Sequence, residues 1–207
     1  MKVLVLGATG PTGRHLLTGL LSTGHDVTAL IRNPGALEAE PSLTVVQGDA
    51  TIGEHVTRVA HGQQAIVSTL GSGRSVRPGT LFTEAAGAAL RAAASADINR
   101  IVWLSSFGVG NSFAAASPTQ KLIYSTLLRS LYANKKAADQ VIRGSDLDWT
   151  LVYPTRLTDG PRTAHYTSAE DLPMQGNPTI SRADVAHFMT SALSETEWTR
   201  KTVIITS

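Results

Sequence analysis

KVLVLGATGPTG, residues 2–13, joins an aliphatic run directly to three glycines, and an apolar helical pattern follows through residues 16–21. This order predicts a strand, a tight glycine turn and a helix. We expect Gly7 to reverse the chain, Gly10 to let the backbone approach a diphosphate, and Gly13 to let the helix lie close to the sheet. The unpaired N–H groups at the helix start then form a phosphate site. The turn also supplies further candidate contacts to a dinucleotide: Thr9, Pro11 and Thr12.

The composition is that of a globular protein, with 16% charged and 42% hydrophobic residues in 207. Basic residues exceed acidic ones by only 18 to 16 and do not cluster, so we expect no nucleic-acid contact. The absence of cysteine excludes a disulfide, a thiol nucleophile and a thiolate metal site. No apolar run approaches the roughly 18 residues of a membrane helix, and no signal-peptide order is present, which favours a cytoplasmic protein without a membrane partner.

Strand patterns alternate with helical patterns along the rest of the chain. The expected strands are residues 26–31, 43–47, 64–70, 100–104, 148–153 and 202–206. The expected helices include 81–96, which is rich in alanine, a stretch that follows residue 118 and ends at Arg143, and one capped by Ser181 and Asp184. This alternation predicts a single Rossmann-type domain over residues 1–207, an α/β fold whose doubly wound, mainly parallel sheet carries helices on both faces.

The end of the second strand indicates which dinucleotide binds. An acidic residue at this place accepts hydrogen bonds from the adenosine ribose 2′-hydroxyl, whereas an arginine pairs with a 2′-phosphate. Residues 27–37 contain no Asp or Glu, and Arg32 stands where the acid would be. We therefore expect NADPH rather than NADH, and the alternative is that Arg32 is a solvated surface residue.

Two further strands end in residues that fit a cofactor site, because ligands of open α/β sheets bind beyond the carboxyl ends of the strands. Asp49 either accepts a hydrogen bond from an adenine amino group or caps the helix that follows, and Ala50 lies beside it. After the fourth strand come candidate contacts to the phosphates and inner ribose: Thr69, Leu70 and Gly71. In the next loop, Arg74 and Arg77 are either an anion clamp or, as we expect, solvated residues.

The fifth strand delivers Ser105 and Ser106 to the same edge, and the sixth strand ends at Tyr153, Pro154 and Thr155. Two stretches with little pattern follow these strands, residues 107–118 and 155–179. Long segments without regular structure are often lids or substrate-binding regions. We therefore expect these two loops to select a small-molecule substrate, whose identity the sequence does not reveal.

These motifs resemble those of the atypical short-chain dehydrogenase/reductases, in particular the NmrA-like proteins and the NADPH-dependent flavin reductases, also called biliverdin-IXβ reductases. The resemblance spans nearly the whole chain and is carried by these residues: 7–13, Arg32, 48–49, 105–106, 144–150 and 180–186. It implies a bound nicotinamide cofactor. It does not specify a substrate, because the family includes both enzymes and redox sensors that do not turn the cofactor over.

In the flavin-reductase interpretation, the protein holds a hydride donor and a flat acceptor ring in contact, and little acid-base chemistry is needed. Ser106 would orient the nicotinamide amide or the acceptor, and Tyr153, Pro154 and Thr155 would form the pocket wall. The chain departs from that family at Thr155, where the family has a histidine after the proline. Any role of that histidine is missing here.

A second interpretation uses Tyr132 and Lys136, which form a Tyr-x-x-x-Lys dyad on a helix. Residues four apart share one helix face, so Lys136 would lower the pKa of the Tyr132 phenol and allow proton transfer at a carbonyl, with Ser106 as the third catalytic residue. The alternative is that Tyr132 packs against its own helix while the lysines stay solvated.

The histidines form no metal-binding pattern, because His55 and His61 point to different sides of a helix, and His165 lies in a variable loop. We therefore expect an NADPH-dependent oxidoreductase that transfers hydride to a small aromatic or carbonyl acceptor, with a flavin-like or quinone-like ring favoured. The alternatives are a Tyr/Lys-dependent carbonyl reductase or epimerase and a dinucleotide-binding redox sensor without turnover. The sequence does not indicate the oligomeric state.

Overall fold

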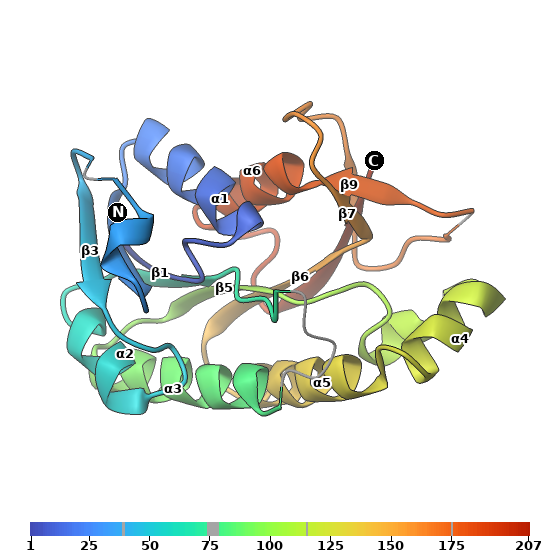
Figure 1. Ribbon diagram of the computed structural model, residues 1–207, viewed down its shortest axis with the longest axis horizontal. Helices are drawn as coiled ribbons and strands as arrows, with labels where there is room; N and C mark the ends of the chain where they lie inside the picture. Colours follow the sequence, from blue (N-terminus) through green and yellow to red (C-terminus); the bar gives the residue numbers. More distant parts are fainter. Residues whose placement is uncertain (39, 74–78, 115, 175) are drawn as a thin grey trace.

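β1 and β4 lie side by side in the middle of an eight-stranded sheet, and the chain runs outward from them in both directions (Figure 1). The strand order is β3-β2-β1-β4-β5-β6-β10-β8, with all neighbours parallel except β8, which pairs antiparallel with β10. This computed structural model describes residues 1–38, 40–73, 79–114, 116–174 and 176–207. The expected fold class, a mainly parallel α/β sheet, is confirmed, and Arg74 and Arg77 lie outside the described residues.

The strands of the large sheet are β1 (Lys2–Leu6), β2 (Asp26–Ile31), β3 (Leu43–Gln47), β4 (Ala65–Ser68), β5 (Arg100–Leu104), β6 (Asp148–Pro154), β8 (Thr167–Ala169) and β10 (Lys201–Thr206). A separate parallel pair consists of β7 (Arg156–Thr158) and β9 (Thr179–Ser181). The α-helices are α1 (Pro11–Ser22), α2 (Gly53–Ala60), α3 (Leu81–Ser95), α4 (Pro118–Ser125), α5 (Arg129–Arg143) and α6 (Arg182–Ala192).

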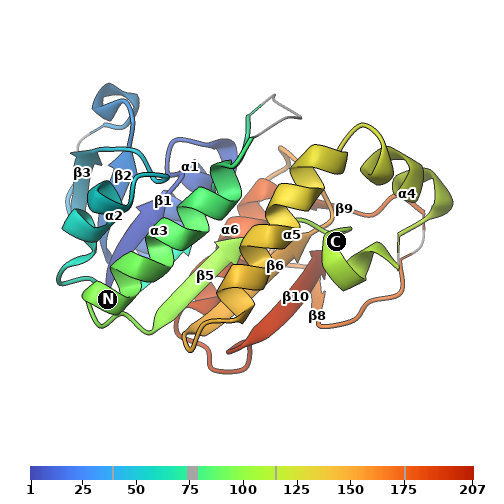
Figure 2. The same cartoon turned by 90° about the horizontal axis from the view of Figure 1, so that it is seen from below.

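Helices cover both faces of the sheet, as expected. α1 and α6 lie on one face, and α2, α3 and α5 lie on the other (Figures 1 and 2). Alternate residues of β1 face opposite layers: Val3 and Val5 pack with α1 and α6, while Leu4 and Leu6 pack with the other helices. All four side chains are fully buried, which explains why the strand reads as a continuous hydrophobic run rather than an alternating one.

The alanine-rich helix α3 packs closely against its layer. Its buried residues are Phe82, Ala85, Ala86, Ala88, Ala89, Ala92 and Ala93. Small side chains on one face let the helix backbone approach the sheet, while alanine also favours the helical conformation. None of the helices in the described part of the chain is both long and apolar enough to cross a membrane.

The structure corrects two local expectations. The helix expected to run to Arg143 is interrupted at Thr126, whose backbone is not helical and whose hydroxyl donates to the Leu122 carbonyl. α4 therefore ends at Ser125, and it projects from the body (Figure 2). Asp49 does not cap α2, because Ile52 occupies the N-cap position.

The structure also tests the expectations for the start of α6 and for the stretch 155–179. The Ser181 hydroxyl accepts from the Asp184 backbone N–H and begins α6, so the expected cap is confirmed. The stretch 155–179, expected to be mostly loop, also contains β7, β8 and the first residue of β9. Each of these strands has three residues, which are too few to leave a periodic pattern in the sequence.

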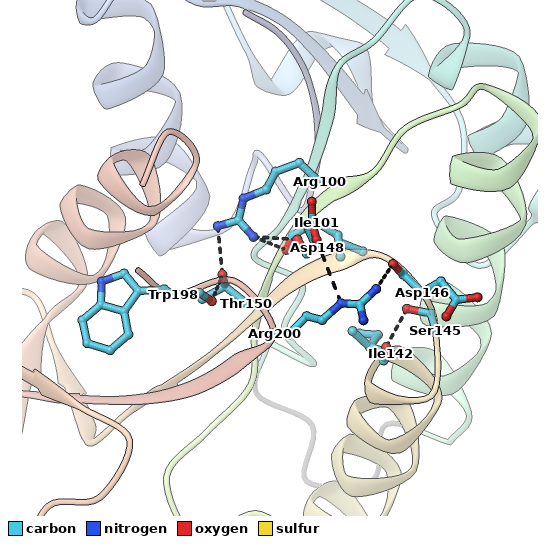
Figure 3. A network of polar contacts seen from close by, with 9 residues as sticks. All are labelled: Arg100, Ile101, Ile142, Ser145, Asp146, Asp148, Thr150, Trp198 and Arg200. Atoms are coloured by element: carbon cyan, nitrogen blue, oxygen red, sulfur yellow. Dashed lines mark hydrogen bonds and ion pairs between the residues drawn. The ribbon is translucent and has the colours of Figure 1, made fainter. Parts of the chain in front are cut away.

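Arg100 joins three elements at the amino ends of the strands (Figure 3). Its guanidinium donates to the carbonyl of Asp148 at 2.6 Å, to the Thr150 hydroxyl at 2.8 Å and to the Ala192 carbonyl. Thr150 in turn donates to the carbonyl of Trp198 at 2.7 Å. The network therefore ties β5 to β6 and to the end of α6.

We expect Arg100→Met to lower the free energy of unfolding by about 2–3 kcal/mol, because the three acceptors lose a charged donor in a partly buried place. Urea denaturation monitored by circular dichroism measures the change. Arg129→Met is the control, since Arg129 is exposed and its side chain makes no hydrogen bond or ion pair with the described residues. Equal stabilities of the two variants would contradict the role given to Arg100.

Candidate functional site

The carboxyl ends of β1 and β4 meet at the centre of the sheet, where the strand order changes direction. Gly7 has φ +88°, and a Cβ on it would lie 2.8 Å from the Leu70 nitrogen. The Thr69 hydroxyl donates to the Gly7 carbonyl at 3.2 Å. Open α/β sheets bind ligands at such a switch point, so the residues after β1 and β4 lie where a cofactor is expected.

The start of α1 fits the diphosphate of a dinucleotide. Gly10 is the N-cap and no side chain caps this helix, so the amides of its first turn remain available to an anion. Pro11 occupies the first turn, where its missing N–H costs nothing. A Cβ on Gly13 would lie 2.2 Å from the Gly7 carbonyl oxygen, so only glycine lets the helix begin this close to the turn. Other residues of the turn are half-buried or buried: Thr9 and Thr12.

A cavity of about 380 Å³ lies at the carboxyl ends of β2 and β3. Its lining residues are Arg32, Gln47, Gly48, Asp49, His55 and Arg58. Asp49 accepts hydrogen bonds from the Thr51 N–H and hydroxyl at 2.9 and 2.8 Å, and the Thr51 N–H is the main reason that the pKa of Asp49 is lowered. The carboxylate is therefore ionised at neutral pH. Ala50, also expected to contact the cofactor, is 8% exposed.

A buried polar network lies beneath the carboxyl ends of β5 and β6. One carboxylate oxygen of Asp139, on α5, accepts from the Ser105 hydroxyl at 2.7 Å and from the Tyr153 hydroxyl at 2.6 Å. Arg143 donates to the same tyrosine oxygen at 2.9 Å. Burial raises the pKa of Asp139, although these hydrogen bonds and the charge of Lys135 oppose the shift. Tyr153, expected in the pocket wall, is 1% exposed and points toward α5.

Lys135 is the lysine that reaches the serines at the end of β5. Its ammonium donates to the Ser106 hydroxyl at 2.8 Å and to the Ser105 carbonyl at 2.9 Å, and it lies 5.0 Å from the centre of the Phe82 ring. The side chain is buried, and burial lowers the pKa of Lys135 to about 8, which the nearby Asp139 opposes. A buried ammonium of this pKa both orients Ser106 and holds a proton at its oxygen.

The structure places Tyr132 against the loop that directly follows Ser106, whereas Lys136 makes no hydrogen bond to Tyr132 or Ser106 among the described residues. The Tyr132 hydroxyl donates to the Phe107 carbonyl at 3.1 Å, and its ring stacks on Tyr124 at 4.6 Å. Burial raises the pKa of Tyr132, which opposes its use as a base. Lys136 is exposed. A catalytic role for this dyad stays a prediction.

Polar contacts at Asp184, Arg182 and His187 attach the loop 155–179 to α6. Asp184 accepts from the backbone N–H groups of Thr163 and Ala164, both at 2.8 Å, and from the hydroxyls of Thr163 and Ser181.

Thr155 is buried, and its hydroxyl donates to the Thr206 hydroxyl at 3.1 Å. Position 155 therefore packs against the last strand. Pro154, at the end of β6, is also buried. Leu70 is partly buried and packs against the core, whereas Gly71 is exposed.

Sequence reasoning missed Lys135, Asp139 and Arg58. Lys135 and Asp139 are four residues apart on α5, on the face that also buries Ala138 and Ile142. A lysine and an aspartate at the apolar positions of a helix are the signal that would have indicated a buried pair. Among the described residues, no group of three or more His, Asp or Glu side chains is arranged to hold a metal ion.

Known proteins resemble this chain in sequence and in fold. A family model described as NAD(P)H-binding matches residues 7–196. The Bacillus subtilis (strain 168) protein YhfK, described as an uncharacterized sugar epimerase, is 30% identical over 202 residues, which is 94% of this chain and 89% of YhfK. Two solved structures share the fold. The first is the oxidoreductase ylbE from Lactococcus lactis, with a TM-score of 0.84 and 22% sequence identity, covering 99% of this chain and 90% of that chain. The second is the anaerobillin reductase ChuY from Escherichia coli O157:H7, with a TM-score of 0.83 and 24% sequence identity, covering 99% of this chain and 96% of that chain.

The lowered pKa of Lys135 predicts how stability depends on pH. Between about pH 8 and 10.5 the unfolded chain holds a proton that folded Lys135 has lost, so this residue makes the free energy of unfolding rise with pH, by at most about 1.4 kcal/mol per unit. We expect Lys135→Met to lose this contribution and Lys136→Met to keep it. Urea denaturation of the three proteins at pH 7.5, 8.5 and 9.5 measures the slopes. Parallel slopes for all three would contradict the burial of a charged Lys135.

Proposed function

Because the chain belongs to the NAD(P)H-binding family, we propose that it is an oxidoreductase that uses NADPH to reduce a small acceptor. A flavin-like or quinone-like ring is the favoured acceptor. The preference for NADPH over NADH is supported by Arg32, which lines the cavity beyond β2, and by the lack of an acidic residue between positions 27 and 37.

Different residues of the chain bind the cofactor and orient the reacting groups. The first-turn amides of α1 bind the diphosphate, and Asp49 accepts from the adenine amino group. When bound, the reduced nicotinamide supplies a hydride to the acceptor. Lys135 fixes the Ser106 hydroxyl, which orients the nicotinamide amide or the acceptor.

The position of Tyr132 is the observation that supports a flavin-like or quinone-like acceptor. The Tyr132 hydroxyl donates to the Phe107 carbonyl, its pKa is raised, and Lys136 is exposed, which favours an acceptor that needs no Tyr/Lys dyad. A flavin or quinone ring accepts hydride without a strong acid beside it, because the charge is spread over the ring and water supplies the proton. This favours ring reduction over carbonyl reduction.

A second candidate function is sugar epimerisation or carbonyl reduction through Tyr132 and Lys136. The description of YhfK as a sugar epimerase favours it, since that protein matches most of this chain. It requires Tyr132 to leave the Phe107 carbonyl and Lys136 to turn toward it. The same substitution therefore distinguishes the two candidates.

We expect steady NADPH oxidation with flavins or quinones, and we expect Tyr132→Phe to keep it within about twofold, because the Phe ring preserves the stack on Tyr124. Ser106→Ala should lower kcat by about tenfold or more, since the oriented hydroxyl is lost. Absorbance at 340 nm with a panel of flavins, quinones and ketones measures reduction by both variants. Chromatography of nucleotide sugars after incubation detects epimerisation, which causes no net oxidation of NADPH.

Three results would contradict the proposal. Turnover of ketones or sugars alone, abolished by Tyr132→Phe, would establish the second candidate. Tight NADPH binding without turnover of any acceptor would indicate a sensor. Loss of flavin and quinone reduction in Tyr132→Phe would show that the phenol takes part in the reaction.

We expect Gly10→Ala to fold and to bind NADPH at least about tenfold more weakly, because its Cβ enters the space of the diphosphate. Gly10 has φ −69°, which alanine adopts, and the nearest atom to a Cβ is the Gly7 oxygen at 3.4 Å. Gly144→Ala is the matched control, with the Gln140 oxygen at the same 3.4 Å but beyond the other end of the strands. Fluorescence titration measures affinity, and unchanged affinity in Gly10→Ala would contradict the placement of the diphosphate.

A further inference from the structure

The cavity beyond β2 and β3 contains a second arginine that the cofactor motif did not predict. Arg32 follows β2, Asp49 follows β3, and Arg58 comes from the last turn of α2. Two guanidinium groups and one carboxylate therefore share one cavity of about 380 Å³. The formal charge of the lining is positive, which suits an anion with more than one negative charge.

Gln47, the last residue of β3, connects the two arginines. Its carbonyl accepts from the Arg58 guanidinium at 3.1 Å, and its side-chain amide donates to the Arg32 carbonyl at 3.4 Å. The first bond turns Arg58 toward the strand end and leaves most of its five N–H donors unused. Neither arginine is within ion-pair distance of a carboxylate in the described part of the chain.

The other polar residues of the cavity already make hydrogen bonds within the protein. One oxygen of Asp49 accepts two hydrogen bonds from Thr51. The Nδ1 atom of His55 accepts from the Asp49 N–H at 3.1 Å, so its ring is oriented and its Nε2 carries the hydrogen in the neutral form. Asp49 is an acceptor and suits an amino group. The cationic donors that remain for an anion are Arg32 and Arg58.

We propose that Arg58 is a second ligand of the adenosine 2′-phosphate, which the two arginines hold between them. This proposal rests on the proposed use of NADPH and adds a residue that determines cofactor specificity. A phosphate monoester carries about two negative charges and three acceptor oxygens, which one guanidinium does not satisfy. Two planar guanidinium groups match it in charge and in hydrogen-bond geometry. NADH has a hydroxyl at this position and gains little from either arginine.

Binding of NADP⁺ and NAD⁺ to the full chain, measured by titration calorimetry, tests the proposal. We expect Arg58→Met to raise the Kd for NADP⁺ at least about tenfold and to leave the Kd for NAD⁺ within about twofold. The fragments 2′,5′-ADP and 5′-AMP should show the same contrast. Arg91→Met is the control, because it removes an equal charge from an arginine that lies against Gly53 of α2 and does not line the cavity.

Each outcome either supports or overturns the assignment. Equal weakening of NADP⁺ and NAD⁺ would mean that Arg58 stacks on the adenine or holds α2 in place, and it would overturn the phosphate contact. Unchanged binding of NADP⁺ by Arg58→Met, or the same loss in Arg91→Met, would also overturn it. If the wild-type protein binds neither nucleotide, the proposed function itself fails. If it binds NADP⁺ tightly and Arg58→Met does so equally, only the role of Arg58 fails.

Discussion

The close approach of α1 to the turn after β1 is the constraint on which the arrangement depends. A Cβ on Gly13 would collide with the Gly7 carbonyl oxygen at 2.2 Å, and a Cβ on Gly7 would collide with the chain after β4. The absence of side chains at these two positions brings the helix start, the first strand and the fourth strand to one place. The carboxyl ends of the neighbouring strands are aligned by the parallel register, so each delivers its residues to the same edge.

The chemistry proposed here depends on charges that are buried at that edge. Lys135 and Asp139 are removed from water, and their burial is tolerated because each makes hydrogen bonds to serine or tyrosine partners. Asp139 binds Ser105 and Tyr153, and Lys135 binds Ser106, so two adjacent serines are oriented from one helix. One oxygen of Asp139 has no hydrogen-bond partner among the described residues, which is consistent with the raised pKa of this carboxyl.

Features encoded by neighbouring residues could be predicted from the sequence, whereas those set by tertiary packing could not. The strand, glycine turn and helix at residues 2–22, and the cap formed by Ser181, involve contacts over a few residues. Lys135 and Lys136 are adjacent on one helix, and only burial against β5 distinguishes them. Arg58 enters the cavity through a bond to the end of β3, eleven residues away, and nothing in its own helix indicates this. The antiparallel edge strand β8 was missed because three residues carry no periodicity.

Arg100 and its partners lie at the amino ends of the strands, opposite the cofactor edge. The hydrogen bonds that join β5, β6 and α6 at the amino ends of the strands do not involve the residues proposed to face the ligand. Mutations in the loops that we propose select the acceptor can therefore accumulate without weakening this network. A scaffold divided in this way tolerates evolutionary drift in substrate preference, and it is a suitable starting point for redesigning the acceptor pocket.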